Sequence, residues 1–450
     1  MKLFRDSILG MILFIMIPLA GWSQSMPARA LDNVTIHTAE GKTIETGTIV
    51  WRNGIIEAIG SDVSIPFDAY VIDGGDSLYV YPGFIDGLAL WASPDLPAKY
   101  SKPEAPGNPG YERAGIQPHR QPNKLLAKAD SFKKARKHGF TTAALGLKGQ
   151  MLPGQIDLFF VNGKDTGAYL IREGIGLSAS FEQAPGSFGN GAYPATLMGV
   201  MARFRQLWYD AAALREQSAY YASVSSGYPV PARDEVLEAL YPAMDKEQPL
   251  FFKADTKEHI SRLFRLKDEL DFNVVLVSGK EGFQQAEELR KRNIPVLASV
   301  DFPEEPGWRV KEREGEDEAE VTEEMRRFRE RQLQAYQARI TNIQRLIEAG
   351  VKVGYASNGM KIEDLKKHIQ ILMDEGGLSE NQILAMLTQH TADILGIGDK
   401  TGDLKQGHVA SFTVFTRPFT EAEAQALYSV SGGKLSEFEI TTSEKEDKAE

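Results

Sequence analysis

Cysteine is absent from the 450 residues of this chain, and positive charge is in deficit. Without cysteine the protein can form neither a disulfide nor a lipid-anchored N-terminus. Asp and Glu number 62 against 51 Lys and Arg, which gives a formal net charge of −11. We therefore expect no nucleic-acid or anionic-membrane partner. The seven histidines are few as well, and none has the H-x-H or H-x-x-x-H spacing of paired metal ligands.

One long apolar run lies near the N-terminus, at residues 8–19. Lys2 and Arg5 precede this run, and the small residues Gly21 and Ser23 follow it. The layout is typical of a secretory signal peptide, residues 1–23, cleaved after Ser23. An uncleaved N-terminal anchor is the alternative, but the run is shorter than the ~20 residues that a membrane span needs. We expect a periplasmic or secreted protein without a membrane span in its mature chain.

The remaining length and composition fit one large domain with a smaller one beside it. Apolar residues make up 42% and charged residues 25%, as in ordinary globular proteins. Disorder is expected only in the charged tail, residues 441–450, which has no apolar side chain of any size to bury.

Both ends of the mature chain have the pattern of short β-strands. At the N-terminal end, residues 24–81 contain β-branched stretches at 33–38, 47–51 and 54–59, and Asn53-Gly54 is a strong hairpin signal. At the C-terminal end, residues 397–440 contain a similar stretch at 402–415. Because neither end has enough strands for a stable sheet alone, we predict one small β-sandwich built from both.

The middle of the chain, residues 82–396, alternates helices with apolar strands. Predicted helices at 132–138, 259–270 and 284–292 are followed by apolar stretches at 140–145, 273–277 and 294–300, and a further stretch lies at 351–356. Several of these helices stop at Gly or Asn, the usual left-handed stop. Apolar strands alternating with helices favour a parallel sheet covered by helices. We predict an α/β fold, a (β/α)8 TIM-like barrel.

Three segments interrupt this alternation. Residues 93–123 are rich in Pro and Gly and predict a long loop. Residues 181–194 predict a mobile loop over the barrel mouth. A helix is expected to follow this second loop, and its Arg203 or Arg205 either binds a substrate carboxylate or is solvated. The third segment, 311–330, is a mixed-charge run, and we expect its charged face to be solvated or to bind a partner. Its apolar positions predict a long helix with one buried stripe: Val321, Met325, Phe328, Leu333, Tyr336, Ile340, Ile343 and Ile347.

Four short stretches carry a resemblance to a known family. They are Tyr-Pro-Gly-Phe-Ile-Asp at 81–86, His-Gly-Phe-Thr-Thr at 138–142, and the segments 387–397 and 401–407. Together with the N-terminal strands they resemble the amidohydrolase superfamily, in particular its exported imidazolonepropionase-like branch. The resemblance implies a divalent metal at the C-terminal mouth of the barrel, held by imidazoles and a carboxylate. Such a metal lowers the pKa of bound water to about 7.

The family's metal ligands are not found at the matching positions of this chain. Leu88 and Leu90 replace the H-x-H pair that follows the first strand, and Lys253 and Ser278 stand at the histidine positions of strands five and six. Asn358 stands where the resemblance places an aspartate after the last strand. The resemblance therefore implies an amidohydrolase-like protein without its metal, and we expect no cofactor.

The polar residues left near the mouth offer two interpretations. In one, Lys253 is a desolvated base or nucleophile of a metal-free site, oriented by Asp86 or Asp255. In the other, Lys253 pairs with a carboxylate and fills space that a metal occupies in the family.

Three functions follow from these observations. The first is a pseudoenzyme that serves as a partner or scaffold, for an active amidohydrolase paralogue or through self-association. The second is a hydrolase of peptide or non-peptide C–N bonds with a reduced or metal-free site. The third is a binding protein that captures a small molecule, such as a peptide or cyclic amide, in the pocket where the family holds its metal and substrate.

Overall fold

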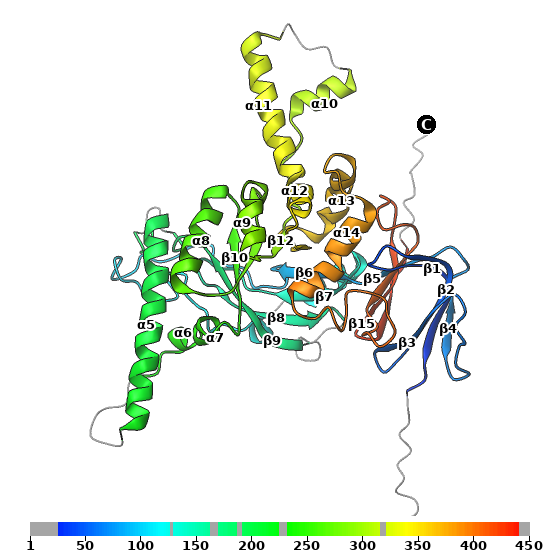
Figure 1. The fold of residues 1–450 in the computed structure, drawn as a ribbon, viewed down its shortest axis with the longest axis horizontal. Coiled ribbons are helices and arrows are strands. Elements are labelled where there is room, and N and C mark those ends of the chain that lie inside the picture. Colours follow the sequence, from blue (N-terminus) through cyan, green and yellow to red (C-terminus); the bar gives the residue numbers. More distant parts are fainter. Residues whose placement is uncertain are drawn as a thin grey trace, which may run out of the picture.

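The computed structural model describes residues 26–126, 129–162, 170–186, 191–224, 232–315 and 321–440. The expected signal peptide (1–23) and disordered tail (441–450) lie outside the described residues. Figure 1 shows a large mixed α/β body, a smaller group of strands beside it, and two helices that project from the body as an arm. No helix among the described residues combines the length and apolar character that a membrane crossing requires.

The large body is organised around one eight-stranded sheet in the order β13-β12-β11-β10-β9-β8-β7-β6. Its strands are β6 Phe84–Ala89, β7 Phe140–Leu145, β8 Gly154–Phe160, β9 Leu170–Ser180, β10 Leu250–Ala254, β11 Val274–Ser278, β12 Val296–Ala298 and β13 Val353–Tyr355. Neighbouring strands pair in parallel except around β8, which is antiparallel to both β7 and β9. The mixed α/β class and the predicted apolar strands are confirmed, but the antiparallel strand departs from a simple (β/α)8 alternation.

The two end strands of this sheet approach each other. Asn358 donates its backbone N–H to the carbonyl of Leu88 at 2.9 Å, and Ser357 donates its backbone N–H to Asp86 Oδ1 at 2.9 Å. Among the described strands no ladder pairs β6 with β13. The arrangement is consistent with a TIM barrel, and these two bonds connect the strands at the two edges of the sheet.

Helices cover the outer face of the sheet, and apolar side chains fill its inner face. Along β10, Phe252 packs into the large core with the helices, while Phe251 packs into a separate core with Leu88, Val277 and Leu297. This alternation is the two-residue period of a strand buried on both faces. The covering helices are α3 Ala129–Lys137, α5 Leu197–Ser223, α8 Lys257–Leu270, α9 Ala286–Lys291, α12 Asn342–Glu348, α13 Leu365–Asp374, α14 Glu380–Leu387 and α15 Gln389–Ile394.

Both chain ends contribute to the second sheet, as predicted. Its order is β16-β15-β14-β5-β1-β2-β3, and β4 also pairs with β1. The strands are β1 Arg29–His37, β2 Thr43–Arg52, β3 Ile55–Gly60, β4 Tyr70–Asp73, β5 Tyr79–Pro82, β14 Phe412–Phe415, β15 Ala426–Ser431 and β16 Lys434–Glu437. The ends join where Val80 of β5 lies opposite Val414 of β14. The pairings form a single sheet, and the two packed layers of a sandwich are not confirmed.

The projecting arm consists of α10 Gly307–Glu314 and α11 Glu323–Ile340 (Figure 1). The prediction of one long helix with a continuous buried stripe is wrong in two respects. First, the helix is divided in two, because α11 ends at Ile340 and α12 begins at Asn342, with Thr341 between them. Second, Met325 and Phe328 are 49% and 54% exposed, whereas Tyr336 and Ile340 are buried. Only the half of α11 nearest the body has a surface to pack against, so the stripe is buried only there.

Candidate functional site

The carboxyl ends of β6 and β10 and the turn after β13 meet around a small pocket of about 50 Å³. The structure brings together four of the residues that the resemblance places at metal-ligand positions, since Leu88, Leu90, Lys253 and Asn358 all line this pocket. A typical small-molecule site has a volume of roughly 300–1,000 Å³. The pocket at these strand ends, here called the mouth pocket, is therefore much smaller than a site that holds a substrate.

Hydrocarbon fills the space beside β6. Leu88 is 2% exposed and belongs to the apolar core inside the sheet, and Leu90 packs against the same core. Gly87, between Asp86 and Leu88, has no room for a side chain. A Cβ there would lie 2.5 Å from Leu297 Cδ2 and 2.7 Å from the carbonyl oxygen of Tyr355. The strand thus packs closely against β12 and β13, with leucines directed at the mouth.

Lys253 forms an ion pair at the mouth. Its Nζ lies 3.0 Å from Glu182 Oε1, and the two side chains are 40% and 48% exposed. A lysine acts as a base only when its neutral amine is populated, which needs strong burial or a neighbouring cation. Lys253 is instead half-exposed and paired with a carboxylate. Glu182 belongs to the segment 181–194, which the sequence predicts as a loop over the mouth, but no sequence signal marks it as the partner of Lys253. Residues 187–190 of that segment lie outside the described residues.

Asp86 lies beneath the mouth, in the protein interior. Burial raises the pKa of its carboxyl to about 6, against the opposing effect of hydrogen bonds from Ser357, Trp91 and Leu88. The backbone N–H groups of Ser357 and Leu88 donate to Oδ1 at 2.9 and 3.3 Å, and Trp91 Nε1 donates to Oδ2 at 3.3 Å. With both oxygens engaged, Asp86 joins β6 to the turn after β13 and is not among the residues that line the mouth pocket.

Ser278 and Asp255 occupy the neighbouring strand ends. Ser278 is buried and has a left-handed backbone with φ 73°, and its Oγ has no hydrogen-bond partner among the described residues. Asp255 Oδ1 is likewise buried and without a partner in that part of the chain. The register places Ser278 opposite Ala254. Neither Ser278 nor Asp255 lines the mouth pocket, so the structure does not bring them to Lys253 as a catalytic group.

The residues at the mouth do not fit the divalent metal that the resemblance implies. Leucine side chains have no lone pair, and Lys253 has an ammonium already paired with Glu182. Within the described ranges, no group of three or more His, Asp or Glu side chains is placed to hold a metal ion. None of the described histidines lines the mouth pocket, and the nearest described contact is that of His259 with Phe181, the residue before Glu182, at 5.6 Å between ring centres. His37 stacks on Tyr81 in the second sheet at 4.6 Å, and His368 packs against Phe302 at 5.6 Å.

Arg203 and Arg205, which the sequence offers as binders of a substrate carboxylate or as solvated residues, are partly exposed. Arg205 Nε lies 2.7 Å from Glu269 Oε1, and the Arg203 guanidinium lies 5.8 Å from the centre of the Tyr111 ring. Both arginines therefore interact with other surface side chains, and neither lines the mouth pocket.

Comparisons with known proteins agree on the fold. The family model described as "Amidohydrolase family" matches residues 310–435. An amidohydrolase from Thermotoga maritima MSB8 is 18% identical, with a TM-score of 0.73 over 90% of this chain and 99% of that chain. A prolidase complexed with N-methylphosphonate-L-proline is 15% identical, with a TM-score of 0.51 over 92% of this chain and 100% of its own. A triazine hydrolase variant is 14% identical, with a TM-score of 0.50 over 91% and 94%. A search of curated proteins found no match.

Proposed function

We propose that this chain, a member of the amidohydrolase superfamily by its fold and by the family-model match, is a pseudoenzyme that serves as a partner or scaffold subunit. The observation that carries the proposal is the mouth pocket of about 50 Å³, lined by Leu88, Leu90 and the Lys253–Glu182 ion pair. Hydrolysis at this place needs room for a substrate and a group that activates water. The mouth offers neither.

A metal-free hydrolase is less well supported by the same contacts. Lys253 is the one strong base that lines the mouth pocket, and its ammonium is balanced by Glu182 and reached by solvent. Ligand capture at the barrel mouth is also less well supported, because a peptide or cyclic amide needs several times the volume of the mouth pocket.

The arm supports a role in association. Its helix α11 presents Met325 and Phe328 to solvent, 49% and 54% exposed, at the end away from the body. A partner that covers these two side chains would remove their apolar area from water. The partner under this proposal is an active amidohydrolase paralogue or a second copy of this chain.

The test of the proposal is an activity assay with a matched rescue. The mature chain is supplied with zinc, manganese, iron and nickel and assayed against dipeptides, cyclic amides and N-aryl amides. We expect no turnover above a Lys253→Met control. A second variant restores the family's pattern, with Leu88→His, Leu90→His, Lys253→His, Ser278→His and Asn358→Asp. Turnover by the unmodified chain that disappears in Lys253→Met, with the fold retained by circular dichroism, would contradict the proposal. The proposal is supported if the restored variant binds metal and the unmodified chain does not.

We also propose export, on the basis of the N-terminal pattern at residues 1–23. The expected result is that protein recovered from the periplasm or medium begins at Gln24. Recovery from the cytosol with Met1 intact would contradict it.

A further inference from the structure

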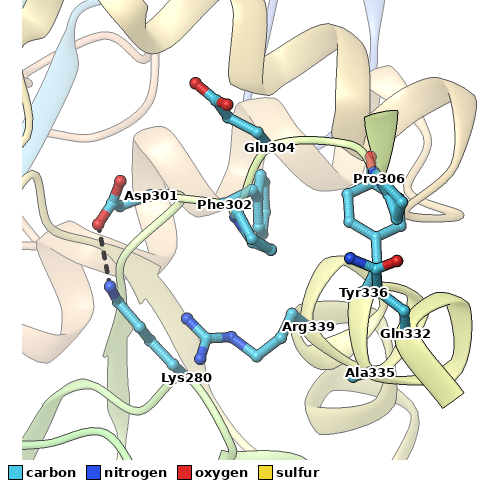
Figure 2. Close-up of a pocket in the computed structure, with 10 residues that line it drawn as sticks. Lys280, Asp301, Phe302, Glu304, Pro306, Gln332, Ala335, Tyr336 and Arg339 are labelled. Carbon is cyan, nitrogen blue, oxygen red and sulfur yellow. Dashed lines mark hydrogen bonds and ion pairs between the residues drawn. The ribbon is translucent and has the colours of Figure 1, made fainter. Parts of the chain in front are cut away.

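A second and much larger cleft lies at the base of the arm. Its volume is about 560 Å³, against about 50 Å³ for the mouth pocket. Lys280 after β11, the loop at 301–306 after β12, and the proximal half of α11 form its walls (Figure 2). The cleft therefore lies beyond the carboxyl ends of two barrel strands, where open space commonly binds ligands in α/β proteins. Its volume is in the range of a small-molecule site.

The walls of this cleft are fixed by contacts that do not involve a ligand. The ring of Phe302 packs at a steep angle against His368, with 5.6 Å between ring centres. On the opposite wall Tyr336 is buried, and its hydroxyl lies 3.5 Å from Glu375 Oε1. Glu375 also accepts a hydrogen bond from Arg309 Nη1 at 2.5 Å. Two aromatic side chains are thus held in place on either side of the space before a ligand enters, which lowers the cost of binding.

The charges in the cleft leave one cation available. Lys280 Nζ lies 2.9 Å from Asp301 Oδ2, so these two charges neutralise each other. Arg339 extends its guanidinium into the space between Lys280 and Phe302 (Figure 2), and within the described ranges no carboxylate pairs with it. A planar guanidinium binds a carboxylate through two parallel hydrogen bonds. Glu304 at the exposed rim disfavours ligands that carry several negative charges.

We propose that the cleft at the base of the arm binds a small organic monocarboxylate with an aromatic or flat apolar group. Arg339 holds the carboxylate, and Phe302 and Tyr336 contact the apolar part. The assignment does not depend on whether the barrel mouth is catalytic, because none of these residues lines the mouth pocket. A ligand bound in the cleft contacts both α11 and the loop after β12, so binding favours the position of the arm in which the two lie together.

The test is direct binding of phenylacetate to the full mature chain by isothermal titration calorimetry. Phenylacetamide is the neutral isostere, and acetate is the carboxylate without the ring. We expect phenylacetate to bind measurably and more tightly than either. Arg339→Met should weaken phenylacetate binding roughly tenfold to hundredfold, the effect of a charged hydrogen-bonded pair. Phe302→Ala should reduce the preference for phenylacetate over acetate.

Arg331→Met is the matched control, since Arg331 is an exposed residue of the same helix outside the cleft. Its affinity for phenylacetate should equal that of the unmodified chain. The proposal is overturned if phenylacetate does not bind, if phenylacetamide binds equally well, or if Arg339→Met binds phenylacetate as tightly as Arg331→Met. A thermal melt of each variant without ligand shows that the fold is retained.

Discussion

Lys253 Nζ lies 3.0 Å from Glu182 Oε1, and Lys253 stands at the strand end where the resemblance to amidohydrolases places a metal ligand. Lys253 extends from β10, and Glu182 follows β9 by two residues. The pair therefore joins two adjacent strand ends across the mouth pocket. Together with Leu88 at the end of β6 and Leu90 just after it, the pair gives the mouth a surface of hydrocarbon and balanced charge.

The ion pair should contribute little to stability. Both partners are 40% or more exposed, and pairs of that kind contribute roughly 0–1 kcal/mol. We expect Lys253→Met and Glu182→Gln each to change the free energy of unfolding, measured by urea denaturation, by less than about 1 kcal/mol. A loss of several kcal/mol in either variant would mean that the pair is desolvated in solution.

Leu88 should be far more sensitive. It is 2% exposed inside the sheet, and replacing a buried leucine by alanine costs roughly 2–5 kcal/mol. We expect Leu88→Ala to lower the urea midpoint strongly, and Leu125→Ala, at a 38% exposed leucine, to leave it nearly unchanged. Equal effects at the two positions would show that Leu88 is not packed as described.

Gly87 should not tolerate a side chain. A Cβ would lie 2.5 Å from Leu297 Cδ2 and 2.7 Å from the Tyr355 carbonyl oxygen, so the strands must separate in Gly87→Ala. Overpacking of this kind costs roughly 1–3 kcal/mol. Gly107 is the control, because a Cβ there meets nothing within 4 Å. We expect Gly107→Ala to melt within a degree or so of the unmodified chain, and an equal melting point for Gly87→Ala would contradict the close packing around Gly87.

Asp86 makes stability depend on pH in a particular direction. Burial raises the pKa of its carboxyl from 3.8 to about 6, so between these values the folded state holds a proton that the unfolded state has lost. The contribution of Asp86 to the free energy of unfolding is therefore most favourable below pH 3.8. It declines as the pH rises to about 6 and is constant above that. The shift corresponds to about 3 kcal/mol.

The measurement is the free energy of unfolding of the unmodified chain and of Asp86→Asn at several values between pH 4 and 7. The amide cannot titrate, so the difference between the two proteins should change across this window in favour of Asp86→Asn as pH rises. A difference that is independent of pH would show that the Asp86 carboxyl has an ordinary pKa in the folded protein.

The sequence predicted those features that depend on local patterns. Asn53-Gly54 does join two strands, with left-handed φ of 51° and 83°, and Gly139 and Gly350 do stop helices with φ of 92° and 80°. The pairing of both chain ends in one sheet also followed from the strand patterns. The turn and the helix ends are recognisable because few residue types other than Gly and Asn adopt a positive φ.

Features that depend on distant contacts could not be predicted in the same way. The segment of β8, Gly154–Phe160, carries no signal for strand direction, because direction is set by the neighbours β7 and β9. Glu182 becomes the partner of Lys253 through the alignment of two strand ends 71 residues apart in sequence. Met325 and Phe328 fit a buried helical stripe by spacing alone, but α11 extends beyond the body that would cover them. The cleft at Arg339 likewise depends on how the arm meets the loop after β12.

The most direct test of the central claim is the metal content of the purified mature chain, measured by mass spectrometry after refolding with zinc, manganese, iron and nickel. We expect substoichiometric metal that is unchanged by Asp86→Asn or Asp255→Asn. Near-stoichiometric metal that is lost in either variant would contradict it and would place a metal centre beneath the mouth.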